Sequence, residues 1–251
     1  MNSTEIRRKS FLEYRMEKDL SDKKENIEQL FDKIAFRYDL LNHIMSFGID
    51  KIWRRRAIKY VSDAGENLNI LDVATGTADL ALAAMKCNPQ HIVGADISAK
   101  MLEIGRQKVK KKGLSDKIEL IEASSENLPF DDNYFDVSMV SFGVRNFAKL
   151  KKGLSEMRRV TKKSGSVVIL EFSKPRMFPF KQLYNFYLFK VIPCIGRMIS
   201  KEKEAYSFLP ESIKKFPDND DFLNIMSESG LKNVRQKKLT FGVASIYVGN
   251  V

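Results

Sequence analysis

Residues 69–77 read NILDVATGT, an apolar strand pattern that runs directly into a turn around Gly76. A second apolar run, residues 91–96, ends in Asp96, twenty positions after that glycine. This layout is typical of a nucleotide-binding βαβ unit, in which glycine lets the backbone approach the ligand and the distal carboxylate accepts hydrogen bonds from ribose hydroxyls. The alternative is a plain α/β turn with a solvated Asp96. We favour the cofactor interpretation because turn and acid occur together.

The turn favours S-adenosylmethionine over a dinucleotide. A dinucleotide site needs a second glycine so that the backbone can reach a pyrophosphate, and Ala78 stands at that position. S-adenosylmethionine contains adenosine, lacks a pyrophosphate and ends in an amino-acid group. Asp72 and the Gly76–Thr77 turn are suited to that group, because a carboxylate accepts from its ammonium and a turn binds its carboxylate.

Composition describes an ordinary globular protein of 251 residues, 43% hydrophobic and 30% charged. The formal charge of +11 suggests attraction to nucleic acid or to acidic lipid headgroups. A lysine-rich composition without any binding role is the alternative. Cys87 and Cys194 lack metal-ligand spacing, so we expect free thiols, no metal and a reducing compartment. No stretch looks like a signal peptide or a membrane span, so we expect a cytoplasmic protein.

The chain divides into a charged tail over residues 1–25 and one domain over residues 26–251. Residues 26–60 show helical periodicity and predict an N-terminal helical lid. From residue 69 strands and helices alternate, which favours a parallel sheet. The expected strands are 69–74, 91–96, 117–121, 134–141 and 165–172, and the expected helices are 77–86, 99–112 and 149–162. Gly165 is expected to close the last of these helices and to open the fifth strand. Prolines and aromatics break the alternation over 174–210, which predicts a helical insertion before a helix at 219–229 and a strand pair at 231–238 and 241–248.

Five parallel strands followed by a closing pair is the plan of the class I methyltransferases. We therefore expect an α/β, Rossmann-like fold with a mostly parallel seven-stranded sheet and an antiparallel last strand. N-terminal helices and a helical insertion after the fifth strand complete the expected fold. Ligands of such sheets bind beyond the carboxyl ends of the strands, where the strand order reverses. That rule gathers residues 75–77, Asp96, the segment after Glu122 and residues 141–146 around one crevice.

Seven segments of the chain resemble the ubiquinone/menaquinone biosynthesis C-methyltransferase family. Three of them are shared with many methyltransferases: LDVATGTAD (71–79), GADIS (94–98) and LPFDDNYFD (128–136). Four are specific to the family: FDKIAFRYD (31–39, continuing to Ile49), SFGVRN (141–146), LEFSKP (170–175) and LPESI (209–213, followed by Phe216-Pro217). Together they cover nearly the whole chain, about residues 27–249.

The resemblance implies S-adenosylmethionine-dependent methylation of a ring carbon on a polyprenylated quinol, and we favour demethylmenaquinol over a benzoquinol. By position, the cofactor residues are Thr77, Asp96, Ser124, Ser125 and Ser141, beside Asp72 and Gly76. One departure concerns the adenine contact, because the family usually has Asp or Asn followed by Ala where this chain has Ser124-Ser125. A serine hydroxyl can still pair with the adenine amino group.

Carbon is a poor nucleophile unless its ring is electron-rich, so the substrate must be the reduced quinol. A cation beside the nascent phenolate, or a base, would activate it further. Arg145 is the expected cation because it follows the fourth strand, and Asn146 is expected to hold the other quinol oxygen. An arginine that caps a helix or pairs with a surface acid is the rival interpretation.

The general base stays open among four candidates: His43, Asp79, Tyr206 and Glu211. His43 has a suitable unperturbed pKa, although a lone histidine on a helix is more often structural. A reaction without a dedicated base remains an alternative.

The aromatic insertion is expected to line a channel for the prenyl tail and to rest on an anionic membrane surface through its basic residues. We therefore expect peripheral contact with the inner face of the membrane. A helix that merely buries its aromatics is the alternative. A nucleic-acid partner is disfavoured. Nucleic-acid methyltransferases have a tetrad of the type NPPY at the end of the fourth strand, where its asparagine meets the exocyclic amine of a flipped base, and this chain has SFGV (141–144) there. A small-molecule O-methyltransferase, a non-enzymatic binding module and a homodimer remain open.

Overall fold

The computed structural model describes residues 29, 32, 35, 42, 43, 46, 48–192 and 203–251, without the side chains of residues 203–207 and 209. The expected tail (1–25), sixteen of the 35 residues of the expected lid (26–60) and residues 193–202 of the insertion lie outside the described residues, as do Cys194 and the side chain of Tyr206. Within the described ranges, no helix combines the length and the apolar character that crossing a membrane requires.

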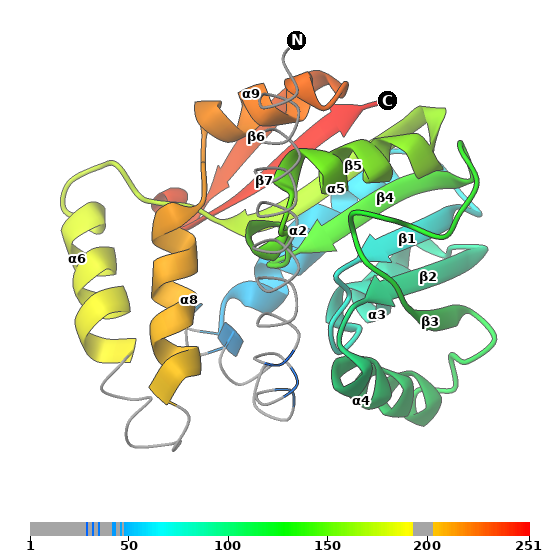
Figure 1. Ribbon diagram of the computed structural model, residues 1–251, viewed down its shortest axis with the longest axis horizontal. Coiled ribbons are helices and arrows are strands. Elements are labelled where there is room, and N and C mark those ends of the chain that lie inside the picture. Colours follow the sequence, from blue (N-terminus) through cyan, green and yellow to red (C-terminus); the bar gives the residue numbers. More distant parts are fainter. Residues whose placement is uncertain are drawn as a thin grey trace, which may run out of the picture.

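Seven strands form one sheet in the order β3-β2-β1-β4-β5-β7-β6 (Figure 1). β7 runs antiparallel to β5 and β6, and the other neighbouring pairs are parallel. The expected fold class is therefore confirmed. The strands are β1 (Asn69–Val73), β2 (His91–Asp96), β3 (Ile118–Glu122), β4 (Phe135–Ser141), β5 (Thr161–Phe172), β6 (Lys232–Leu239) and β7 (Ala244–Asn250).

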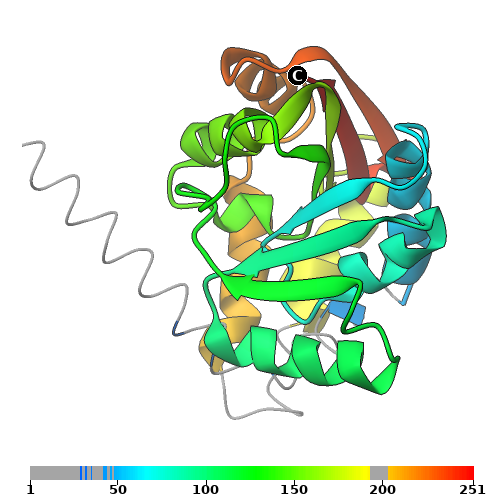
Figure 2. The ribbon, with the colours of Figure 1, turned by 90° about the vertical axis from the view of Figure 1, so that its right-hand side faces the viewer.

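Helices cover both faces of the sheet because side chains along each buried strand alternate between two cores. Ile70 belongs to the core that contains residues of α2 (Asp50–Ser62), α3 (Asp79–Ala84) and α4 (Ala99–Lys111). Leu71 belongs to the core on the other face, with α5 (Leu150–Val160) and α9 (Asp220–Glu228). Figure 2 shows α5 (light green) and α2 (blue) on opposite sides of the strands.

The insertion after β5 is helical from Phe180 onward where it is described. It contains α6 (Phe180–Phe186), a π-helical segment η3 (Tyr187–Val191) and α8 (Lys203–Lys215). Figure 1 places α6 and α8 together beyond the end of β5, outside the sheet proper. The remaining elements are the short 3₁₀ segments η1 (Met85–Cys87), η2 (Val144–Asn146) and η4 (Thr240–Gly242).

Most expected boundaries agree with the structure to within about two residues, but the start of the fifth strand was wrong. β5 begins at Thr161, not at Gly165, and it is irregular where Phe135 and Val137 of β4 pair with it. A Cβ atom on Gly165 would lie 2.4 Å from the carbonyl oxygen of Asp136. Gly165 is therefore needed for a close backbone approach inside a strand, and it does not mark where the helix stops.

Candidate functional site

The carboxyl ends of β1 and β4 define the candidate site. These strands are adjacent, yet the chain leaves β1 for β2 on one side and passes from β4 to β5 on the other. The loops that follow them diverge there, which creates the crevice in which open α/β sheets bind ligands. The loop after β1 contains Gly76, and the loop after β4 contains Arg145.

The loop after β1 is held in an unusual backbone conformation. Ala74, Gly76 and Ala78 all have positive φ angles, of 51°, 56° and 65°, and only glycine adopts this region without strain. The neighbouring loops leave little space around it. A Cβ atom on Gly143 would lie 2.6 Å from the Cβ of Ala74, and one on Gly94 would lie 2.9 Å from Oγ1 of Thr75. The turn is therefore fixed by close backbone packing from β2 and β4.

Asp96 anchors the turn from the end of β2. Its Oδ2 accepts a hydrogen bond from the backbone N–H of Gly76 at 2.8 Å, and its Oδ1 accepts from the backbone N–H of Ser98 at 3.0 Å. Burial raises the pKa of the Asp96 carboxyl, and the backbone hydrogen bonds oppose that rise. The side chain is only partly covered, and each carboxylate oxygen has a further lone pair for a ligand hydroxyl.

Asp72, in β1, holds the same turn through hydrogen bonds to residues on both sides of it. Its Oδ2 accepts hydrogen bonds from Oγ1 of Thr75 at 2.7 Å and from the backbone N–H of Ala81 at 3.0 Å. Burial raises the pKa of this carboxyl to about 7. Its Oδ1 is buried and has no hydrogen-bond partner among the described residues. A buried acceptor of this kind favours a positively charged donor, so the residues fit the ammonium and ribose groups of S-adenosylmethionine.

A chain of charged groups connects Thr77 to α2. Nζ of Lys108 donates to Oγ1 of Thr77 and to Asp79, both at 2.8 Å. The other oxygen of Asp79 lies 3.7 Å from Nη2 of Arg54. Arg54 in turn donates to Asp50. Asp79 therefore belongs to a structural charge network behind the turn at Gly76.

His43 lies at the far end of this network. Its Nδ1 lies 2.8 Å from Oδ1 of Asp50, which also accepts from Oγ of Ser46 at 3.0 Å. Burial acts to raise the pKa of Asp50, but the charge of Arg54 and the hydrogen bond from Ser46 hold it below its usual value. These contacts give His43 a structural partner. Glu211, another candidate base, is exposed on α8.

Ser124, Ser125 and Ser141 lie at the ends of two strands. Ser141 ends β4, and the serine pair follows β3; all three side chains are partly buried. The hydroxyl of Ser124 donates to Oε2 of Glu126 at 2.7 Å. Oε1 of Glu126 accepts from the backbone N–H of Ala148 at 2.8 Å, which ties this loop to the loop after β4. In this arrangement Ser124 already has a local partner.

The side chain of Arg145 is fully buried and paired with an acid that we did not predict. Its Nη1 lies 2.7 Å from Oε1 of Glu171, and neither side chain is exposed. Nη1 also donates to the carbonyl oxygen of Phe142 at 2.5 Å, and Nε donates to Oγ of Ser212 at 3.2 Å. Burial raises the pKa of Glu171, and the charge of Arg145 opposes that rise. The partner of Arg145 is thus a core carboxylate, not a surface acid.

Glu171 carries a signal that could have identified it. It follows Val167, Val168, Ile169 and Leu170 in an otherwise apolar end of β5, and acidic residues are almost never fully buried without a partner. An acid at the carboxyl end of a central strand also lies at the ligand-binding edge of the sheet.

Aromatic rings separate the two buried arginines. The Cζ of Arg54 lies 5.5 Å from the ring centre of Phe142, and that of Arg145 lies 5.5 Å from the ring centre of Phe172. The two phenylalanine rings are 4.6 Å apart, and both contact the ring of Trp53. The loop after β4 therefore connects the turn at Gly76 to the aromatic cluster of Trp53, Phe142 and Phe172.

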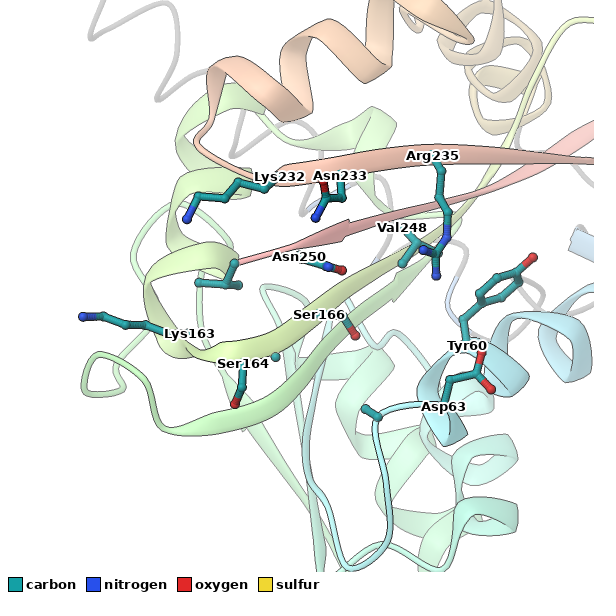
Figure 3. Close-up of a pocket in the computed structure, with 13 residues that line it drawn as sticks. Tyr60, Asp63, Lys163, Ser164, Ser166, Lys232, Asn233, Arg235, Val248 and Asn250 are labelled. Carbon is teal, nitrogen blue, oxygen red and sulfur yellow. The ribbon is translucent and has the colours of Figure 1, made fainter.

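A separate cavity of about 340 Å³ lies away from this crevice (Figure 3). Tyr60 of α2, Ser166 of β5, Arg235 of β6 and Val248 of β7 line it. Lys163 and Lys232 lie at its rim. None of the predicted site residues lines it, because it opens where β5 and β6 begin, whereas the crevice lies where the parallel strands end. The geometry at Gly76 and Asp96 therefore identifies the candidate site, and this cavity is a different feature.

Comparison with known proteins gives consistent matches over almost the full chain. The family described as the "ubiE/COQ5 methyltransferase family" matches residues 18–250. The demethylmenaquinone methyltransferase of Bacteroides fragilis is 47% identical over 226 residues, covering 90% of this chain and 92% of that protein. The ubiquinone/menaquinone biosynthesis C-methyltransferase UbiE of Geobacter sp. strain M21 is 48% identical over 232 residues, covering 92% of this chain and 98% of that protein.

Solved structures share the fold at low sequence identity. An S-adenosylmethionine-dependent methyltransferase from Thermotoga maritima is 16% identical with a TM-score of 0.62, covering 88% of this chain and 98% of that chain. Another from Aquifex aeolicus is 19% identical with a TM-score of 0.54, covering 78% of this chain and 89% of that chain. These likenesses support the fold.

Proposed function

This chain belongs to the ubiE/COQ5 methyltransferase family, and from that premise we propose that it methylates a ring carbon of a polyprenylated quinol. Its activity is S-adenosylmethionine-dependent methyl transfer, and demethylmenaquinol is the substrate we favour. The carrying observation is the hydrogen bond between Asp96 and the backbone of Gly76 at the carboxyl edge of β1 and β2. This hydrogen bond joins the glycine turn and the distal carboxylate, the two features that a nucleoside-containing methyl donor requires.

The proposed cofactor residues act by position. Asp96 would accept hydrogen bonds from the ribose hydroxyls, while Asp72 and the turn at Gly76 and Thr77 would hold the amino-acid end. Ser141 lies at the end of β4, and Ser125 follows β3 at the same edge of the sheet, so both remain proposed contacts. Ser124 would have to turn away from Glu126 to reach an adenine amino group. When bound, S-adenosylmethionine supplies a methyl group, which the ring carbon takes up as it loses its own proton.

Arg145 would stabilise negative charge on a ring oxygen of the quinol. Its guanidinium is held by Glu171, Ser212 and the carbonyl of Phe142, so its position is set before substrate arrives. A cation with a fixed position in a water-excluded site stabilises developing charge without reorganisation. Because arginine keeps its proton at any accessible pH, the role of Arg145 is electrostatic. A separate general base would have to take the proton of the ring hydroxyl.

The insertion would bring the enzyme to its lipid-borne substrate. Large apolar side chains on and beside α6 are exposed: Phe178 at 76%, Phe186 at 63% and Leu183 at 61%. Lys181 and Lys190 are exposed on the same segment, and the chain carries a formal charge of +11. Exposed aromatic and aliphatic residues flanked by lysines suit the interface of an anionic bilayer, so we propose peripheral contact with the cytoplasmic face of the membrane.

Vesicle sedimentation tests the membrane proposal. Replacing Phe178 and Phe186 with serine should weaken binding to vesicles of phosphatidylcholine and phosphatidylglycerol, and raised salt should weaken it further. Ile52→Ser, at a residue 48% exposed on α2, is the matched control and should bind as the wild type does. Equal binding by all three proteins would contradict the proposal. Light scattering of the protein without vesicles tests whether it forms a homodimer.

Mass spectrometry of the reaction product tests the catalytic proposal. The protein is incubated with S-adenosylmethionine and a short-chain demethylmenaquinone, with and without dithionite. A product one methylene heavier, formed only under reduction and carrying the methyl on ring carbon, is expected. A methyl ether would instead identify an O-methyltransferase. No product from either a naphthoquinol or a benzoquinol would contradict the proposal and make small phenols and RNA the next substrates to test.

A further inference from the structure

Tyr184 is a buried residue on an otherwise solvent-facing helix. Its side chain is 4% exposed, whereas Leu183 and Phe186 in the same helix α6 are more than half exposed. The hydroxyl of Tyr184 is buried and has no hydrogen-bond partner among the described residues. Burying an unpaired hydroxyl opposes folding, so phenylalanine would serve the fold better at this position. Packing alone therefore does not explain the hydroxyl.

Two more unpaired polar atoms belong to the loop after β4. Nη2 of Arg145 and Oδ1 of Asn146 are buried without a partner in the described part of the chain. Nη2 carries two N–H donors. The other nitrogens of Arg145 are engaged, since Nη1 donates to Glu171 and Nε donates to Ser212. Among the described residues, one arm of a rigidly held guanidinium is thus left with free donors.

The Tyr184 hydroxyl lies within the electrostatic reach of this loop. Burial raises its pKa above the ordinary value for tyrosine, the charge of Arg145 opposes the rise, and the charge of Glu171 adds to it. Tyr184 is therefore a neutral phenol, which can donate its proton in a hydrogen bond. Ser212, which binds Arg145, lies on α8 of the same insertion, so α6 and α8 both contribute to the surroundings of the guanidinium.

We propose that the hydroxyl of Tyr184 and Nη2 of Arg145 donate hydrogen bonds to the same ring oxygen of the substrate, with Asn146 next to Arg145 in the chain. This inference rests on the proposed function and adds a substrate-binding residue from the insertion. As the ring hydroxyl loses its proton to the general base, its oxygen keeps the electron pair, and the two donors stabilise the resulting charge. The ligand class is an electron-rich hydroxyarene whose oxygen is held by a neutral and a cationic donor.

The first test is Tyr184→Phe, which keeps the ring and removes only the hydroxyl. Methyl transfer to reduced short-chain demethylmenaquinone should fall by about 100- to 1,000-fold in kcat, as for the loss of one donor to a developing oxyanion. Affinity for S-adenosylmethionine should stay the same, and the melting temperature should stay the same or rise. Tyr134→Phe, at an exposed tyrosine before β4, should match the wild type in every measurement.

The second test reads the ionisation of a bound hydroxyarene and needs no turnover. 1-Naphthol is titrated by absorbance against pH in the presence of protein saturated with S-adenosylhomocysteine. Two donors at the oxygen favour the anion, so the pKa of bound naphthol should be lower in the wild type than in Tyr184→Phe.

The outcomes separate the inference from the proposed function. An active wild type together with an equally active Tyr184→Phe and an unchanged naphthol pKa would overturn the role of Tyr184 and leave the quinol methyltransferase standing. Parallel losses of cofactor affinity and melting temperature in Tyr184→Phe would show a structural role and overturn it too. A wild type that makes no product from any quinol would overturn the proposed function, and the inference with it.

Discussion

Oε1 of Glu171 lies 2.7 Å from Nη1 of Arg145, and neither side chain is exposed to solvent. Removing one member of a buried pair leaves the other charge uncompensated. We therefore expect Glu171→Gln to lower the free energy of unfolding by about 3–5 kcal/mol, measured by urea denaturation. Glu119→Gln, on β3 and 61% exposed, should change it by less than about 0.5 kcal/mol. Similar small changes in both variants would mean that the pair is not held as described.

Replacing both charges separates stability from catalysis. Buried ion pairs can be exchanged for apolar residues of similar volume with little loss of stability. A double variant, Arg145→Met with Glu171→Met, should fold and bind S-adenosylmethionine with wild-type affinity, yet show no detectable methyl transfer. Calorimetry and the turnover assay measure the two properties. Loss of turnover and cofactor affinity in equal proportion would instead identify Arg145 as a structural residue.

Asp96→Asn should weaken cofactor binding. Hydrogen bonds to a charged group contribute about 1.5–3 kcal/mol each, so the loss of charge should reduce affinity for S-adenosylmethionine by about 10- to 100-fold. Calorimetric titration measures it. The matched control is Asp131→Asn, at an exposed carboxylate in the loop before β4, which should bind normally. Unchanged affinity in Asp96→Asn would place the cofactor elsewhere.

Gly143→Ala tests the close packing behind the turn. Gly143 has a φ of −112°, which alanine adopts freely, so any penalty arises from contact. The new Cβ would lie 2.6 Å from that of Ala74, and overpacking of this kind costs about 1–3 kcal/mol. Thermal unfolding should show the loss of stability, and calorimetry should show weaker cofactor binding. A variant as stable as the wild type would indicate that the loop after β4 moves freely.

Acid should remove a defined contribution to stability from Glu156. Its hydrogen bonds with Arg159 lower the pKa of Glu156 to about 2, against 4.5 in the unfolded chain. A depressed folded-state pKa stabilises the protein above pH 4.5, and the contribution is lost as pH falls towards 2. At neutral pH it amounts to at most about 3 kcal/mol.

Comparison with Glu156→Gln isolates this effect from the other carboxylates. Denaturation of both proteins at several pH values between 6 and 3 should show a stability difference that shrinks as pH falls. A difference that stays constant over this range would mean that Glu156 titrates normally.

The sequence predicted the sheet well because its strands are short apolar runs bounded by clear turn signals. The hydrophobic pattern alone predicted the strands at 69–73 and 91–96. The spacing of Gly76 and Asp96 indicated the edge of the sheet at which ligands bind. Gly165 misled the prediction of β5, since a glycine after a helix usually marks its end. Here its role is to permit contact with Asp136 across the sheet, which no local pattern reveals.

The candidate site was predicted less completely than the fold. Arg145 was identified as a cation, but the pairing with Glu171 brings together residues from two strand ends that are separated in the chain. Tyr184 was treated only as part of an apolar stretch, since neither burial nor an unpaired hydroxyl can be read from sequence. The sequence also did not reveal the partner of Ser124, whose hydroxyl donates a hydrogen bond to Glu126 two residues later.

Trp53 gives the protein a single built-in fluorophore, because the chain contains one tryptophan. Its indole is 1% exposed, donates to Oγ1 of Thr240 at 2.8 Å and contacts Phe142 and Phe172. Those two rings lie against Arg54 and Arg145. Any ligand that moves either arginine changes the electric field at the indole, so emission from unlabelled protein can follow occupancy of the crevice in real time.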